Sequence, residues 1–238
     1  MGKNDISIAV MQPYIFPYLG YFQLVKEVDK FIVYDVVQYI NRGYINRNKI
    51  LINGESKFFN FQIHKEDQFK KICEVRLKFF LKARQKLLNK LFFSYKKAPF
   101  FDEVFSFIEN IMMEEYNTIS ELNCTTLKRV SEKLELKTYF AKASELNIND
   151  FELMSKEDKL DSIIEKELAE FILMPPGSLE LYENWVPRST CVKNTLTPRA
   201  IRYKQFSNEF VSDLSIIDVL MFNGFKNTSL FLKSNEGV

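Results

Sequence analysis

The chain has 238 residues, of which 46% are apolar, and 33 basic and 31 acidic residues leave a formal net charge of +2. This composition supports a sizeable core and excludes a disordered chain, and the near balance of charge provides no general field for nucleic acid or membrane surfaces. No apolar run approaches the roughly 20 residues of a membrane span, and no secretory pattern opens the chain.

Cysteine and histidine are scarce. The three cysteines, Cys73, Cys124 and Cys191, are far apart and odd in number, which argues against a disulfide framework and favours a reducing compartment. His64 is the sole histidine, and no CxxC pair occurs. We therefore expect a cytoplasmic protein without a bound metal ion and without a membrane span.

The first 35 residues predict a βαβ unit. The continuous apolar run at 6–11 is typical of a strand covered on both faces, as in a parallel sheet. Pro13 and Pro17 exclude a helix in the segment that follows. Helical spacing then predicts a helix over 20–29, and a second buried strand is expected over 30–35. A right-handed crossover should join the two parallel strands.

The middle of the chain is expected to be mainly helical. Asn53-Gly54, between two β-rich runs, indicates a hairpin. From about 69 to 172 helices dominate, and we interpret 69–135 as a helical insertion within a single domain of residues 1–238. The expected face of the first of these helices holds Leu81, Leu87, Leu88, Leu91 and Tyr95.

The last third of the chain supplies the remaining elements of the prediction. Strands are expected over 137–144 and 172–177, with a charged amphipathic helix over 156–171 between them. A short helix over 214–224 should end at Gly224 as its C-cap, and the last dozen residues should be frayed. The predicted class is α/β, with a Rossmann-like, mostly parallel sheet, flanking helices and a largely helical middle segment.

Candidate ligand-binding residues follow the first predicted strand, because ligands of open parallel sheets lie outside the carboxyl ends of the strands. Two prolines pre-organise this loop, and the helix after it offers free N–H groups for an anion such as phosphate. The alternative is that its aromatic rings only pack the mouth of the core. The residues in question are Gln12, Tyr14, Phe16, Tyr18 and Gly20.

A second candidate group follows the second predicted strand. Asp35 comes directly after the apolar run, where an acidic residue often meets a sugar hydroxyl. Arg42 and Arg47 can clasp phosphate or carboxylate, although Arg47 could equally be a solvated strand residue. The polar members that complete this group are Gln38, Asn46 and Asn48.

A third candidate group lies near the C-terminus. Tyr203 and Gln205 precede the apolar helix that carries Asp218. A carboxylate in such a helix is either exposed or buried with partners, and the sequence leaves both open. We expect these three side chains to close the site formed by the other two groups.

Several motifs resemble one family of bacterial proteins. They are "QPYIFPYLGYFQL" at 12–24, "VDKFIVYDVVQYINRGYINRNKI" at 28–50, "KAPFF" at 97–101, "ELN" at 121–123, and "YKQF" followed by "LSIIDVLMFNG". In this order they resemble the WbqC-like family over nearly the whole chain. Val36 stands where the family usually has a second aspartate, so a role for that acidic group is absent or moved.

The resemblance implies a place in surface-polysaccharide (O-antigen) biosynthesis, beside enzymes that act on nucleotide-linked sugars. One hypothesis is a transferase that moves an acyl or aminoacyl group onto a nucleotide-linked amino sugar, with acyl-CoA or an aminoacyl donor. Asp35 would then be the general base, and Gln12 and Gln38 would orient sugar hydroxyls. Arg42 and Arg47 would neutralise the pyrophosphate, and Asn46 or Asn48 would donate to the oxyanion.

Two alternatives stay open. The first unit is similar to that of nucleotidyltransferase and pantothenate-synthetase-like folds, but tyrosine and phenylalanine stand where those families hold phosphate with paired histidines. A non-catalytic partner that binds a sugar nucleotide within a glycan-modifying complex is the other alternative. Whether the chain forms a homodimer also stays open, and no nucleic-acid partner is expected.

Overall fold

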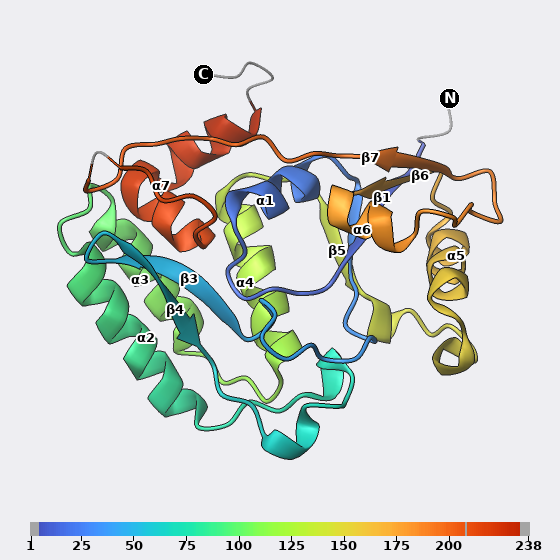
Figure 1. The fold of residues 1–238 in the computed structure, drawn as a ribbon, viewed down its shortest axis with the longest axis horizontal. Helices are drawn as coiled ribbons and strands as arrows, with labels where there is room; N and C mark the ends of the chain where they lie inside the picture. The colour runs from blue at the N-terminus through green and yellow to red at the C-terminus, as the bar shows by residue number, and fades with distance from the viewer. Residues whose placement is uncertain (1–4, 208, 234–238) are drawn as a thin grey trace.

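Five parallel strands form one sheet with the order β5-β2-β1-β6-β7 in the computed structural model, which describes residues 5–207 and 209–233 (Figure 1). The predicted α/β class, with helices flanking a parallel sheet, is confirmed. The strands are β1 (Ser7–Met11), β2 (Lys30–Val33), β5 (Tyr139–Lys142), β6 (Phe171–Met174) and β7 (Val192–Thr195). The last of these was missed in the turn-rich C-terminal third.

The described residues also form seven α-helices, namely α1 (Leu19–Lys26), α2 (Phe80–Tyr95), α3 (Phe101–Met112), α4 (Ile119–Lys133), α5 (Lys156–Glu167), α6 (Pro176–Leu181) and α7 (Ile216–Lys233). Helix α1 connects β1 to β2, which is the predicted βαβ unit. Helix α6 was not predicted, and it begins with proline at its first position, where the missing N–H has no intrahelical partner to lose.

Alternating side chains of the sheet enter two separate cores, because successive strand residues point to opposite faces. Ala9 and Phe31 belong to the larger core, which includes α1, α3, α4 and α7. Ile8 and Ile32 belong to the smaller core, together with apolar side chains of α5. In Figure 1, α5 accordingly lies on one side of the sheet and α1 and α4 lie on the other.

A two-stranded antiparallel hairpin packs beside the sheet. Strands β3 (Arg47–Ile52) and β4 (Glu55–Asn60) are joined at the predicted turn, where Asn53 and Gly54 have φ angles of 53° and 79°. Two positive φ values are typical of the tight hairpin turn that matches the strand twist. The backbone N–H of Leu51 donates to the Tyr95 hydroxyl of α2, so the hairpin is attached to the helical segment.

One expectation about helices is wrong, and another is incomplete. Leu81 points outward and is 58% exposed, whereas its four expected companions on α2 are buried. Helix α7 consists of two helical segments: the first ends at Gly224, as expected, where φ 68° and ψ 177° form a kink, and the second continues to Lys233. A Cβ atom there would lie 2.6 Å from the Phe100 ring, so glycine allows the close approach.

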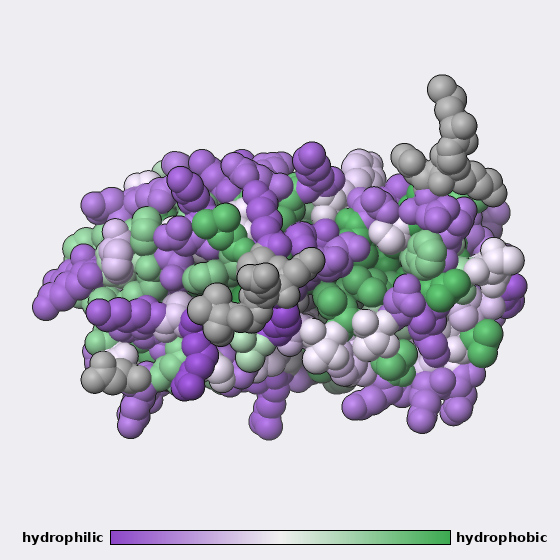
Figure 2. All heavy atoms as spheres, turned by 90° about the horizontal axis from the view of Figure 1, so that it is seen from above, coloured by the Kyte–Doolittle hydropathy of each residue, from purple (hydrophilic) through white to green (hydrophobic). Residues whose placement is uncertain are grey.

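Most of the face seen from above in Figure 2 is hydrophilic, and apolar side chains gather in a band to the right of its centre. That half of the molecule holds the parallel sheet in Figure 1. No helix in residues 5–207 and 209–233 is long and apolar enough to cross a lipid bilayer.

Candidate functional site

The loop between β1 and α1 is held rigidly by buried side chains from three other elements. Asn48 donates to the carbonyl oxygens of Ile15 and Phe16 at 2.9 and 2.8 Å. Asn123 of α4 donates to the Pro13 carbonyl at 2.9 Å, and Ser215 donates to the Phe16 carbonyl at 2.7 Å. The loop carbonyls are thus satisfied from beneath, as irregular backbone in an interior requires.

Phe16 shows how tightly this loop is constrained. Its φ of 41° lies in the left-handed region, which a bulky residue adopts only when the surroundings impose it. The side chain is 1% exposed, so Phe16 does not face a ligand directly. Phe16 therefore packs in the core, although the sequence suggested that it binds a ligand. Tyr14 and Tyr18 are the aromatic residues of this loop that line a cavity.

Two adjoining cavities, which share Tyr18 and Asp213, form an opening that we call the Tyr18 cleft. The first cavity, of about 170 Å³, lies between the start of α1 and residues 198–214. The second, of about 140 Å³, is lined by Tyr14, Pro17, Tyr18, Tyr44, Asn48 and Asp213. A cavity of roughly 150 Å³ accepts a benzene-sized molecule, so each can hold one six-membered ring.

Aromatic rings form the wall of the second cavity. The ring centroids of Tyr14 and Tyr44 are 6.1 Å apart, and those of Tyr14 and Tyr21 are 5.7 Å apart, both tilted. The Tyr21 hydroxyl donates to the Gln12 carbonyl at 2.8 Å, which fixes the start of the loop. Burial raises the pKa of the Tyr14 and Tyr18 hydroxyls, so both stay neutral donors at physiological pH.

The opposite wall is anchored to α1 by one buried glutamine. Gln23 is 5% exposed; its side chain accepts from the Arg199 N–H at 2.7 Å and donates to the Arg199 carbonyl at 3.2 Å. This two-point bond places the exposed Arg199 at the first cavity. A Cβ on Gly20 would lie 2.5 Å from the Tyr18 ring and 2.7 Å from Pro198. Glycine therefore allows the two walls to meet.

Asp218 is the buried, partnered carboxylate that the sequence left as one of two possibilities. It accepts from the hydroxyls of Tyr95 and Tyr203, both at 2.6 Å, and from the Gln205 amide at 2.8 Å. Burial raises the pKa of Asp218, and these hydrogen bonds oppose the shift. Gln205 also bonds both the N–H and the carbonyl of Val211. Of the three predicted residues, only Tyr203 lines the cleft.

Asp35 does not face any opening. Its side chain is 0% exposed, and it accepts hydrogen bonds from the Ser120 hydroxyl at 2.8 Å, the Ser144 hydroxyl at 2.9 Å and the Ser144 N–H at 3.1 Å. This structure therefore does not place the carboxylate where it could contact a bound sugar, and a role for Asp35 in the chemistry stays a prediction. Asp35 instead joins the end of β2 to α4 and to the turn after β5.

The polar groups of residues 38–47 are likewise occupied or remote from the cleft. Asn46 accepts from the Tyr39 hydroxyl at 2.7 Å and donates to the Phe61 carbonyl at 2.8 Å. Arg47 donates to the carbonyls of Gly43 and Arg42, and its guanidinium lies 4.3 Å from the centre of the Phe58 ring. Five polar or charged residues of the first two candidate groups therefore do not line the cleft: Gln12, Gln38, Arg42, Asn46 and Arg47.

The structure therefore does not bring the three candidate groups together in one pocket, and the cleft contains only part of them. Of the predicted binding residues it holds Tyr14, Tyr18, Gly20, Asn48 and Tyr203. Sequence reasoning missed its charged members, Asp213 and Arg199, which come from irregular segments before α7 and after β7. Buried Asn123 was also missed as a residue, although it ends the "ELN" motif.

A separate polar cavity of about 360 Å³ lies where parallel sheets usually bind ligands, at the carboxyl ends of β2 and β5. Its lining includes Lys71, Cys73, Ser144 and Lys159. Burial raises the pKa of the Cys73 thiol to about 11, so this thiol is a poor nucleophile at neutral pH. In the described residues no group of three or more His, Cys, Asp or Glu side chains could hold a metal ion.

The architecture defines a Rossmann-like α/β protein whose cleft lies beside a rigid loop after the first strand. The chain belongs to the WbqC-like protein family, whose family model matches residues 12–230. It is similar to "Uncharacterized protein Rv1507c" of Mycobacterium tuberculosis (strain ATCC 25618 / H37Rv), with 29% identity over 224 residues, 91% of this chain and 93% of that protein. No solved structure matches the chain.

Proposed function

We propose that the protein is a transferase of bacterial surface-polysaccharide biosynthesis that binds a nucleotide-linked amino sugar in the Tyr18 cleft and adds an acyl or aminoacyl group to it. The observation that carries the proposal is the pair of adjoining cavities, one walled by tyrosines and the other flanked by an arginine. A sugar nucleotide has the same two parts, an uncharged ring and a charged diphosphate.

The tyrosine-walled cavity suits the sugar ring. The face of an aromatic ring carries partial negative charge, which attracts the polarised C–H groups of a pyranose. Tyr14 and Tyr44 present such rings, and the neutral hydroxyl of Tyr18 can donate to a sugar oxygen. Pro17 and the buried amide of Asn48 close the cavity at its base. The rigid loop lowers the ordering cost of binding.

The first cavity suits the diphosphate. Arg199 is exposed there and can pair with phosphate oxygens in the bidentate geometry that guanidinium groups favour. The cavity also lies against the start of α1, where Leu19 and Gly20 line it. The positive end of a helix dipole stabilises an anion at this position. Arg199 thus takes over the role that the sequence assigned to Arg42 and Arg47.

Asp213 is the group placed to act as a general base. It is exposed, lines both cavities and accepts one hydrogen bond, from the neighbouring Ser212 hydroxyl at 2.7 Å. In acyl transfer from a thioester, the sugar amine attacks the carbonyl carbon, the N–C bond forms and the C–S bond breaks. Asp213 would accept the amine proton and pass it to the departing thiolate.

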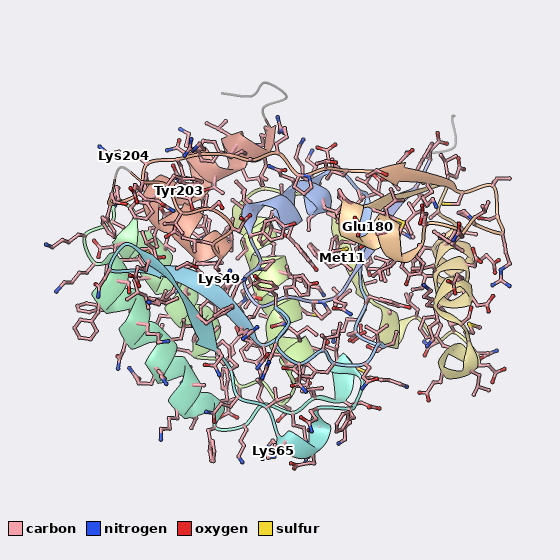
Figure 3. The ribbon with its side chains drawn as sticks, in the orientation of Figure 1. Met11, Lys49, Lys65, Glu180, Tyr203 and Lys204 are labelled. Atoms are coloured by element: carbon pink, nitrogen blue, oxygen red, sulfur yellow. The ribbon has the colours of Figure 1, made fainter. Side chains whose placement is uncertain are left out.

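A thermal-shift panel of nucleoside-diphosphate amino sugars tests binding. We expect at least one member to raise the melting temperature by a few degrees, because a ligand that binds the folded state stabilises it. Tyr18→Ala and Arg199→Ala should abolish the shift. Tyr139→Ala and Lys65→Ala, which remove an exposed tyrosine and an exposed lysine elsewhere, should retain it. Figure 3 places Lys65 at the bottom of the molecule, far from Tyr203.

Incubation of the shifted sugar with acyl-CoA donors, followed by mass spectrometry, separates catalysis from binding. The transferase proposal expects an acylated sugar with the wild type and none with Asp213→Asn, which should still bind. The second candidate is a non-catalytic sugar-nucleotide-binding partner, which is favoured because Asp213 is the only carboxylate among the described residues that line the cleft. An unchanged sugar mass with every donor would support that candidate, and no thermal shift across the panel would overturn both.

A further inference from the structure

Positive charge is concentrated in one segment of the chain. Residues 75–101 contain eight basic residues and no acidic one, although the whole chain has 33 basic and 31 acidic residues. The other 25 basic residues are therefore outnumbered by the 31 acidic ones. The near balance of the whole chain conceals this asymmetry, which is large enough to direct the molecule toward an anionic partner.

Helix α2 carries the centre of this segment along an outer edge of the molecule (Figure 1). Its Lys82, Lys86 and Lys90 recur every four residues, so they form one row along the helix. No ion pair among the described residues involves any of the three. Burial and the charge of Lys86 lower the pKa of Lys90, whose ammonium group also donates to the Phe58 carbonyl at 3.0 Å.

Large apolar side chains near this row are exposed to solvent. Phe93 is 74% exposed, Phe79 is 63% exposed and Leu81 is 58% exposed. Phe79 and Phe93 each line a groove beside the lysine row: one of about 160 Å³ near Asn60 and one of about 630 Å³ near Ile52. Exposed apolar side chains gathered on one surface are typical of an interaction site.

We propose that this surface, consisting of Phe79, Leu81, Lys82, Lys86, Lys90 and Phe93, docks on an anionic lipid bilayer. The lysines contact phosphate headgroups while the apolar side chains enter the boundary with the acyl chains. Surface helices that combine lysines with phenylalanine and leucine bind membranes in this way. The proposal does not depend on the Tyr18 cleft.

The chemistry of the surface favours lipid over nucleic acid. Its outermost apolar side chains contain no polar atom, so they suit hydrocarbon and cannot read base edges. The cations of the row are lysines, whereas arginine is the usual residue for bidentate recognition of nucleic acid. Arg84, on the same helix, is occupied because it donates to the Met112 carbonyl at 3.1 Å.

Vesicle co-sedimentation tests the proposal with the full-length protein. At about 0.1 M salt we expect binding to phosphatidylcholine vesicles that contain about one third phosphatidylglycerol, and release as salt screens the charges. The triple change Lys82→Gln, Lys86→Gln and Lys90→Gln should lower the partition coefficient about 100-fold, since each basic residue near an anionic surface contributes about fivefold. Phe93→Ser should lower it about tenfold through lost apolar burial.

A matched triple change on α5, at the opposite side of the molecule in Figure 1, controls for net charge: Lys156→Gln, Lys159→Gln and Lys166→Gln. Glutamine preserves helix propensity, and circular dichroism confirms that the variants fold. Equal loss with the α5 variant, equal binding to pure phosphatidylcholine, or no sedimentation would overturn the proposal. Tighter binding of single-stranded oligonucleotides through the same lysines would overturn it in favour of nucleic acid.

Discussion

The loop between β1 and α1 and the segment from the end of β2 to the start of β3 were both expected to bind a ligand, yet they use their side chains in opposite ways. In the first, Tyr14 and Tyr18 face the cleft while the backbone carbonyls are bound from beneath. In the second, Asp35, Asn46 and Arg47 bond to neighbouring chain segments. Irregular backbone near a core needs hydrogen-bond partners, and polar side chains often supply them. A segment rich in polar residues is therefore not necessarily a binding surface.

The largest effect should come from Asp35. Asp35→Ala leaves the hydroxyls of Ser120 and Ser144 and one N–H without their buried acceptor, and we expect it to lower the free energy of unfolding by about 3 kcal/mol. Urea denaturation measures the loss. Asp213→Asn, at an exposed position with a φ of 56° that asparagine also adopts, should change stability by less than about 0.5 kcal/mol. Comparable stability losses in the two variants would remove the distinction between the regions.

Paired asparagine variants sharpen the comparison. Asn123→Ala removes donors to the carbonyls of Pro13 and Ile45, and Asn46→Ala removes bonds to Tyr39 and Phe61. Each should cost about 2 kcal/mol of stability. Only Asn123→Ala releases the loop after β1, so it alone should weaken ligand binding in the cleft, about tenfold, through the cost of ordering the loop.

Isothermal titration calorimetry with the sugar nucleotide found in the thermal-shift panel separates these two outcomes. Equal affinity losses in Asn123→Ala and Asn46→Ala would mean that the segment after β2 contributes to the cleft as much as the loop does. Unchanged affinity in both would mean that rigidity of the loop is irrelevant to binding. Either result would contradict the division of roles between the two regions.

A smaller, pH-dependent effect should come from Asp218. Because burial raises its pKa above the ordinary 3.8, the folded state holds this proton to a higher pH than the unfolded chain. Its contribution to stability is therefore greatest below about pH 3.8, and it falls as the pH rises through the raised folded value. As the pH rises from about 3.8, the stability of the wild type relative to Asp218→Asn should decrease. A flat or rising difference in urea unfolding would contradict this.

Much of the fold could be predicted from local patterns. Continuous apolar runs identified β1 and β2, and Asn53-Gly54 identified the hairpin turn, because strand burial and positive φ leave direct traces in sequence. The kink at Gly224 could not be distinguished from a helix end. Both need a positive φ, and the close approach of Phe100 that selects the kink is a long-range contact.

Residues of the cleft were predicted best where they belong to one continuous segment of the chain. Tyr14, Tyr18 and Gly20 share a loop, so their common location follows from the chain itself. Arg199 reaches the cleft because Gln23, 176 residues earlier, binds its backbone, and no local pattern encodes that pairing. The prediction that Asp35 lines the site failed for a different reason. A carboxylate after a buried strand gives the same sequence pattern whether it faces a ligand or, as here, two serines.

The smallest effect on stability, and the sharpest contrast in binding, should come from two arginines. Arg47 holds the turn at 42–43 and stacks on Phe58, so Arg47→Ala should cost about 0.5 to 1 kcal/mol and leave ligand affinity unchanged. Arg199→Ala should leave stability unchanged and weaken a diphosphate-linked sugar about tenfold or more, since a charge-assisted pair is lost. Calorimetry with the sugar alone, without its diphosphate, should show no difference between Arg199→Ala and the wild type. If Arg47→Ala instead abolished binding of the nucleotide sugar, the phosphates would lie over the segment after β2, and the cleft would have to be reassigned.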